Sequence, residues 1–258
     1  MKKILVFIKT KLNTALRLNA YFNQKRGSTY SGALSYFLFT GLIPFIALLI
    51  YALARFNLAG KFTEEFLQGY FPNFEIMQTL VSLAQQRSST IIMLIVGIYT
   101  SANFYLHVIH LGEKFYGKRD KQAVAKRVLA FLYLLLIILL FLACVIIEML
   151  GKRILLILNF NSFLSNFISF ALNLLLSFVL SLLLHHFAYQ QKTTVKSLLN
   201  GILLTFILWQ IIGGIFSLYL KFFSRDTSLI SSVLIFLLYL NFLMRALVYG
   251  IALNALKM

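Results

Sequence analysis

Three ionisable side chains in the stretch "YTSANFYLHVIHLGEKFYG" have types and a spacing that could do chemistry. His107 and His110 are three residues apart, and Glu113 follows after another three, so all three share one face of a helix. Imidazole and carboxylate groups at this spacing suit metal ligation or a proton relay. They are also typical of the solvated edge of a membrane span, where they need no ligand. Both interpretations stay open.

Arg245 is a second candidate, because it lies in the strongly apolar stretch "LNFLMRALVYG". A charged side chain inside a membrane span is costly and marks a candidate functional site. Arg245 could face a cavity of a helix bundle, where it would bind an anion or pair with an acid. Since it lies toward the cytoplasmic end of the last predicted span, its long side chain could instead reach the lipid headgroups.

A third group of candidates lies in "YSGALSYFLFTGLIPFIALL", residues 30–49. Pro44 cannot donate to the carbonyl of Thr40, and this predicts a kink in a helix at that point. One hypothesis is that the kink opens a polar cavity lined by Ser35, Tyr36 and Thr40. The simpler hypothesis is a structural kink combined with close helix packing on the narrow face around Ser35.

Membrane helices must position these candidates. The chain of 258 residues is 60% hydrophobic and 12% charged, with a mean hydropathy of +0.87, whereas soluble domains carry about 25% charged residues. Near-continuous apolar runs of about 20 residues or more predict transmembrane helices. We therefore predict an all-α, polytopic membrane helix bundle that forms one domain over residues 1–258. Its six predicted spans are 30–55, 90–109, 128–150, 163–188, 198–220 and 229–256.

Residues 1–27 precede the first span and predict a further helix. Leu5, Ile8, Leu12 and Leu16 recur at helical spacing, with basic residues elsewhere around the helix. This pattern predicts a basic amphipathic helix on an anionic membrane face. A helix packed against the rest of the protein is the alternative. The first apolar run is too short for a signal peptide.

The basic residues also predict the orientation of the chain. Most of the 24 Lys and Arg lie before the first span, after the second, after the fourth and at the C-terminus. The positive-inside rule then puts both termini in the cytoplasm. The net charge of +17 is therefore mainly a signal of topology. We expect anionic lipid at the cytoplasmic face, and no nucleic acid, as a partner.

The sequence carries no catalytic motif that we recognise. Nucleophile elbows, phosphate-binding loops, paired carboxylates and zinc motifs are missing, and the chain has only seven acidic residues. We therefore expect no enzymatic activity, no catalytic residues, no metal ligands and no cofactor.

Four stretches resemble the YihY/BrkB family: "GALSYFLFTGLIPFIALL", "YTSANFYLHVIHLGEKFYG", "SLLNGILLTFILWQIIGGIFSLYL" and "VYGIALNAL". The last resembles the family's G-A-E-L-N-A, and the resemblance covers nearly the whole chain. Three departures stand out. Ala252 replaces the usual acid of that motif, the usual Y-G-S before the sixth span reads "DTSLISS", and no proline follows the fourth span. A role that depends on that acid cannot operate in this chain.

The resemblance implies a bacterial inner-membrane protein associated with virulence or stress. An older ribonuclease label for the family does not fit a chain without a metal cluster or a soluble nuclease domain. Together with the proline-bearing polar span, Arg245 and the histidines, the resemblance favours a transporter or exporter of a small solute or ion. The alternative is a non-transporting scaffold of the cell envelope or a lipid-handling factor.

Overall fold

The computed structural model describes residues 2–55, 87–117, 123–157, 162–189, 195–223 and 229–257, with side chains for part of these ranges. The described ranges are helical and contain no strand, so the predicted all-α fold is confirmed. Seven helices are present in these ranges: α1 (Lys2–Gln24), α2 (Gly27–Arg55), α6 (Arg87–Tyr116), α7 (Ala123–Ile157), α8 (Ser162–Tyr189), α9 (Val195–Phe223) and α10 (Leu229–Lys257).

Each of the six predicted spans falls inside one helix, from α2 to α10. Within the described residues, three segments are long and apolar enough to cross a membrane: Phe170–Tyr189, Val195–Phe222 and Leu234–Lys257. The chain is therefore a helical protein of the membrane type. The number of six spans and the orientation of the termini stay predictions.

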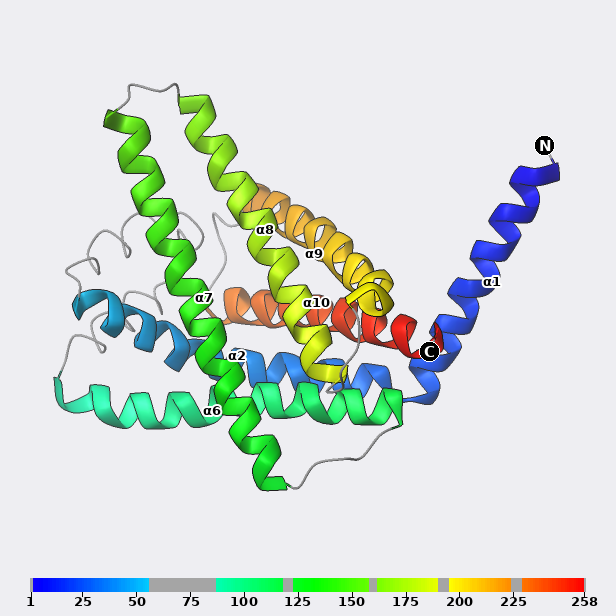
Figure 1. Cartoon of the computed structure of the whole chain (residues 1–258), viewed down its shortest axis with the longest axis horizontal. Coiled ribbons are helices and arrows are strands. Elements are labelled where there is room, and N and C mark those ends of the chain that lie inside the picture. The colour runs from blue at the N-terminus through cyan, green and yellow to red at the C-terminus, as the bar shows by residue number, and fades with distance from the viewer. Residues whose placement is uncertain are drawn as a thin grey trace.

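A tight junction joins α1 to α2. Arg26 adopts a left-handed conformation with a φ of 59°, and its carbonyl accepts a hydrogen bond from the Thr29 amide at 3.1 Å. Gly27 packs directly on the ring of Phe22, and a Cβ at position 27 would clash with that ring. Figure 1 shows α1 running away from the other helices, with its C-terminal end near α10. Leu16, on the predicted apolar face of α1, is exposed.

Most of the described core lies at one end of the bundle, where α2, α7 and α9 begin and α6, α8 and α10 end. We call this end the packed end. There, the ring of Tyr133 at the start of α7 stacks on Phe187 near the end of α8, at 3.5 Å between centroids. The buried apolar side chains of this core include Leu34, Phe104, Val108, Leu111, Phe115, Leu184, Phe187, Leu198, Leu247, Val248 and Ile251.

The helices are arranged around this end in two groups. α2, α6 and α10 run side by side, whereas α7 and α8 incline away from α2 (Figure 1). Large apolar side chains cover the outer faces, as expected for helices in contact with lipid. The exposed ones on α7 and α9 include Val128, Leu132, Leu136, Leu139, Ile207, Ile211, Ile215 and Leu218.

Candidate functional site

Four polar side chains lie fully buried between α8, α9 and α10 at the packed end: Ser181, His185, Thr205 and Asn254. We call them the buried polar cluster. All four are in segments apolar enough to cross a membrane. Burying polar groups in such a setting costs free energy unless each group finds a hydrogen-bond partner inside the protein. The cluster is therefore the first place to look for function.

Asn254 ties the end of α10 to the first turns of α9. Its Oδ1 accepts a hydrogen bond from the amide of Gly201 at 2.7 Å, and its Nδ2 donates to the carbonyl of Leu198 at 3.0 Å. An amide side chain offers an acceptor and a donor at once, and both are used here. Asn254 thus joins α10 to α9 through two backbone groups that lie on the same face of α9.

His185 lies at the centre of the cluster. Its Nδ1 lies 2.8 Å from the carbonyl of Ser181, and since a carbonyl can only accept, Nδ1 carries the proton. Its Nε2 lies 3.4 Å from the hydroxyl of Thr205, which is also 3.4 Å from the carbonyl of Ala246. The Ser181 hydroxyl donates to the carbonyl of Ile202 at 3.1 Å. Ser181 therefore links α8 to α9, and the single proton of the Thr205 hydroxyl can go either to Nε2 of His185 on α8 or to the Ala246 carbonyl on α10.

Two glycines let the three helices approach closely enough for these bonds. A Cβ added at Gly250 would lie 2.6 Å from the Gly201 carbonyl oxygen and 2.8 Å from Nε2 of His185. A Cβ added at Gly201 would clash with the Gly250 carbonyl and with the Asn254 side chain. Small residues at helix interfaces serve this purpose in membrane bundles. Ala252, which stands in place of the acid of the resembled motif, is buried in this core as well.

A second set of polar contacts holds α2 against α6 and α10. Ser101 donates to the carbonyl of Gly41 at 2.9 Å, and this carbonyl follows the one that Pro44 leaves without a backbone donor. Ser35 is buried and accepts from Nδ2 of Asn241 at 3.4 Å. Ser35 therefore lies on the face of α2 that meets α10.

The other residues of the predicted polar cavity do not gather with Ser35. Tyr36 is 60% exposed on the outer side of α2, and the Thr40 hydroxyl donates back to the Tyr36 carbonyl at 3.0 Å. Consecutive residues on a helix point about 100° apart, which separates Ser35 from Tyr36. The side chain of Pro44 lies outside the described residues, so its kink stays a prediction.

The three predicted ionisable residues of α6, His107, His110 and Glu113, do not converge on one site. His107 is half-buried, with its ring 3.9 Å from the ring of Phe37, and the exposed His110 lies 6.2 Å away. Glu113 faces the start of α7 instead, where it pairs with Lys126. Among the described residues, no group of three His, Cys, Asp or Glu side chains could hold a metal ion.

Arg245 is exposed on α10 and reaches the end of α1. Its guanidinium lies 5.8 Å from the centre of the Phe22 ring, and this ring stacks on Tyr249 at 4.1 Å. Tyr249 also donates to Oδ1 of Asn19 at 3.0 Å. Of the two interpretations that the sequence left open, this placement fits a side chain that extends to the surface. The guanidinium of Arg245 there contacts Phe22 of α1.

Sequence reasoning overlooked the buried polar cluster. Gly201 and Asn254 fall within stretches that carry the family resemblance, and both His185 and His186 were visible as a pair. The signal was a set of small and polar residues recurring every three or four positions in α9 and α10, Gly201–Thr205 and Gly250–Asn254. That spacing places each pair on one helix face.

Residues 19–257 match a family model described as Virulence factor BrkB. The match includes every helix from α2 to α10 and the end of α1. No curated protein and no solved structure matches the chain significantly.

Proposed function

The chain belongs to the Virulence factor BrkB family, and on that premise we propose that it is a transporter or exporter of a small solute or ion in the bacterial inner membrane. In this proposal the six predicted spans cross the membrane and both termini lie in the cytoplasm. The packed end is then the cytoplasmic end, because the stretches rich in Lys and Arg adjoin it.

The observation that carries the proposal is the buried polar cluster inside apolar helices. Polar side chains at membrane depth are expensive, and they commonly mark pathways for ions or solutes. A bundle held together by apolar packing alone would not need His185, Thr205 and Asn254 at the junction of three helices. The donors and acceptors of these residues are engaged with one another and with backbone carbonyl and amide groups, so the packed end is closed in this structure.

A transport cycle would require this end to open. Separating α9 from α8 and α10 would free the carbonyls of Ile202 and Ala246 and the side chains of Thr205 and His185 to bind water or solute. Each interhelical hydrogen bond in a membrane is worth only about 0.6–1.7 kcal/mol, so a solute that replaces several of them could drive the change. The Gly201–Gly250 contact is where the two backbones would part.

Flux measurements test the proposal. The purified protein is reconstituted into liposomes of bacterial lipid composition, and the movement of labelled cations, anions, osmolytes and fluorescent phospholipids is followed beside protein-free liposomes. At least one class should cross faster in the presence of the protein. Folded, inserted protein that moves none of them would count against transport and in favour of the second candidate.

The second candidate is an envelope scaffold or lipid-handling factor, and α1 is the observation that favours it. The described part of α1 exposes Leu16 beside Arg17 and extends beyond the bundle (Figure 1). A helix with an apolar and a basic face can lie on an anionic bilayer. Deleting residues 2–16 separates the candidates, because a transporter would keep its flux in liposomes while a scaffold that acts through α1 would lose its cellular function.

A further inference from the structure

A pocket of about 370 Å³ opens between α6 and α7, away from the buried polar cluster. Eight residues line it: Ile98, Tyr99, Ala102, Asn103, Leu106, Arg127, Ala130 and Phe131. Its volume falls in the range of about 300–1,000 Å³ that is usual for small-molecule sites. The lining residues that belong to α6, from Ile98 to Leu106, span about two turns, or about 12 Å along the helix axis.

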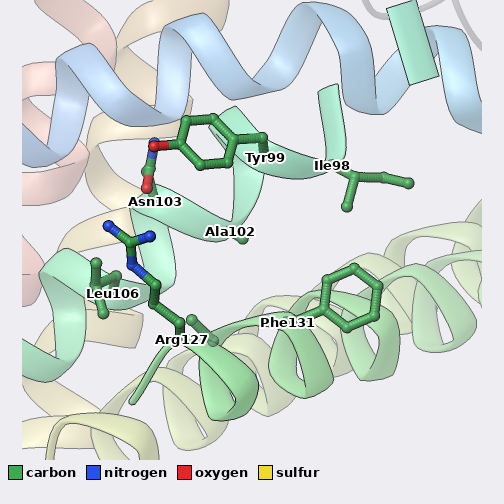
Figure 2. Close-up of a pocket in the computed structure, with 8 residues that line it drawn as sticks. Ile98, Tyr99, Ala102, Asn103, Leu106, Arg127 and Phe131 are labelled. Atoms are coloured by element: carbon green, nitrogen blue, oxygen red, sulfur yellow. The ribbon is translucent and has the colours of Figure 1, made fainter. Parts of the chain in front are cut away.

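The pocket has a polar side and an apolar side. Figure 2 shows the guanidinium of Arg127, the hydroxyl of Tyr99 and the Asn103 side chain close together on one side, with Ile98 and Phe131 on the other. Arg127 lies in the first turns of α7, at the packed end, so the polar side faces the membrane surface that this end adjoins. Toward the bilayer interior, α7 exposes Phe131 and Leu135.

Arg127 is available for a ligand. The neighbouring cation Lys126 points toward α6, where it pairs with Glu113. That ion pair fixes the first turns of α7, and the next residue is rotated by about 100° around the helix, into the pocket. Among the described side chains, Arg127 has no acidic partner. Its guanidinium is exposed and can present several parallel N–H donors to an anion.

We propose that this pocket binds one anionic phospholipid, with the phosphate on Arg127, Asn103 and the Tyr99 hydroxyl and an acyl chain along Ala102, Ala130 and Phe131. Three features select this occupant. The site is open to lipid, its charge lies at the depth of the headgroups, and its remaining walls are apolar. A water-soluble anion would leave the apolar side empty, and a zwitterionic lipid such as phosphatidylcholine would bring a quaternary ammonium cation close to Arg127 together with its phosphate. The proposal goes beyond transport and requires only that these helices lie in a bilayer.

Native mass spectrometry of the detergent-solubilised full chain tests the proposal, with phosphatidylglycerol and phosphatidylcholine of identical acyl chains as probes. We expect tighter binding of phosphatidylglycerol, and a loss of about tenfold in its affinity in Arg127→Gln, as expected for a charge-assisted hydrogen-bond pair. Arg127→Lys should recover part of the loss because it keeps the charge. The matched control is Lys196→Gln, which removes an exposed cation at the start of α9, outside the pocket, and should leave binding unchanged.

A second variant tests the apolar side. Ala102→Phe fills the pocket and should lower the affinity for both lipids. The thermal midpoint of the variant shows whether it is folded, and Ala102→Leu is used if it is not. Equal affinity for the two lipids, or a response to Lys196→Gln as large as to Arg127→Gln, would overturn the proposal. Displacement of the lipid by glycerol phosphate at comparable concentration would do so too, since it would identify a site for a small anion. None of these measurements depends on flux, so the proposed lipid site and the proposed transport function can be refuted independently.

Discussion

Gly201 of α9 and Gly250 of α10 face each other so closely that a Cβ on Gly250 would lie 2.6 Å from the Gly201 carbonyl oxygen. The Gly201 amide also donates a hydrogen bond to Oδ1 of Asn254, so Gly201 contacts two successive turns of α10, at Gly250 and at Asn254. Close backbone contact and interhelical hydrogen bonds are the two main sources of helix association in lipid, where helices gain little from hydrophobic burial. This contact therefore holds the packed end together.

Gly250→Ala should destabilise the protein because the added methyl group would meet Thr205, His185 and the Gly201 carbonyl. Overpacking a tight core costs about 1–3 kcal/mol, so the thermal midpoint in detergent should fall by several degrees. Gly214→Ala on α9 is the matched control, since nothing lies within 4 Å of its Cβ position. It should leave the midpoint unchanged or raise it slightly through better helix propensity. Equal midpoints for the two variants would refute the close contact.

Asn254→Leu keeps the size of the side chain and removes both hydrogen bonds to α9. At about 0.6–1.7 kcal/mol for each interhelical bond in a membrane, the free energy of unfolding should fall by roughly 1–3 kcal/mol. Asn200→Leu, at an exposed position of α9, is the control and should be neutral. Unfolding of both variants in a titration with sodium dodecyl sulfate gives the comparison. A neutral Asn254→Leu would mean that these bonds contribute nothing to stability.

Phe22→Ala should release α1 from the bundle. The Phe22 side chain is fully buried between Tyr249, Arg245 and Gly27, and it supplies much of the apolar contact that α1 makes with α10. Limited trypsin digestion after Lys25 or Arg26 should then become faster by an order of magnitude or more. Leu16→Ala removes an exposed leucine of the same helix and should digest like the wild type. Slow cleavage of Phe22→Ala would show that other contacts hold α1.

Tyr116 should make the protein sensitive to alkaline pH. Burial raises the pKa of its hydroxyl above the usual value of 10.0, so the folded protein retains a proton that the unfolded chain releases. The resulting stability is fully present below pH 10 and is lost as the pH rises beyond it. The hydroxyl is buried near Asn254 without a hydrogen bond of good geometry, so Tyr116→Phe should cost little at pH 7.

Thermal midpoints between pH 7 and 11 check this. The wild type should lose stability more steeply above pH 10 than Tyr116→Phe, whereas Tyr36→Phe, at an exposed position, should follow the wild type. Midpoints of the wild type and of Tyr116→Phe that fall in parallel with rising pH would contradict a raised pKa of Tyr116.

The helices were predictable because long apolar runs leave a membrane chain few alternatives to helix. Which face of each helix meets which neighbour was not predictable from those runs. His185 and His186 are adjacent, and a rotation of about 100° decides that one is fully buried and the other exposed. The same rotation buries Ser35 and exposes Tyr36. Only tertiary packing fixes these rotations, of α8 against α9 and α10 in the first case and of α2 against α6 and α10 in the second.

Arg245 shows a second limit. Its charge within an apolar run correctly marked an unusual position, but the partner is the Phe22 ring, more than two hundred residues earlier in the sequence. Asn254 was equally visible, yet its role depends on the first turns of α9, which only the tertiary structure brings within reach. Residue type identified candidates, and long-range packing assigned their roles.

In the transport cycle that we propose, the packed end must open between α9 and α10 for a solute to pass. Thr205→Cys with Ala246→Cys, in a Cys144→Ser background, puts one thiol on each helix at a point where α9 and α10 are in contact, since the Thr205 hydroxyl lies 3.4 Å from the Ala246 carbonyl. Oxidation of the pair in proteoliposomes locks the two helices together, reduction releases them, and each single-cysteine variant serves as a control. We predict that flux stops on oxidation and returns on reduction in the double variant alone. Flux that continues unchanged through fully cross-linked protein would contradict the account.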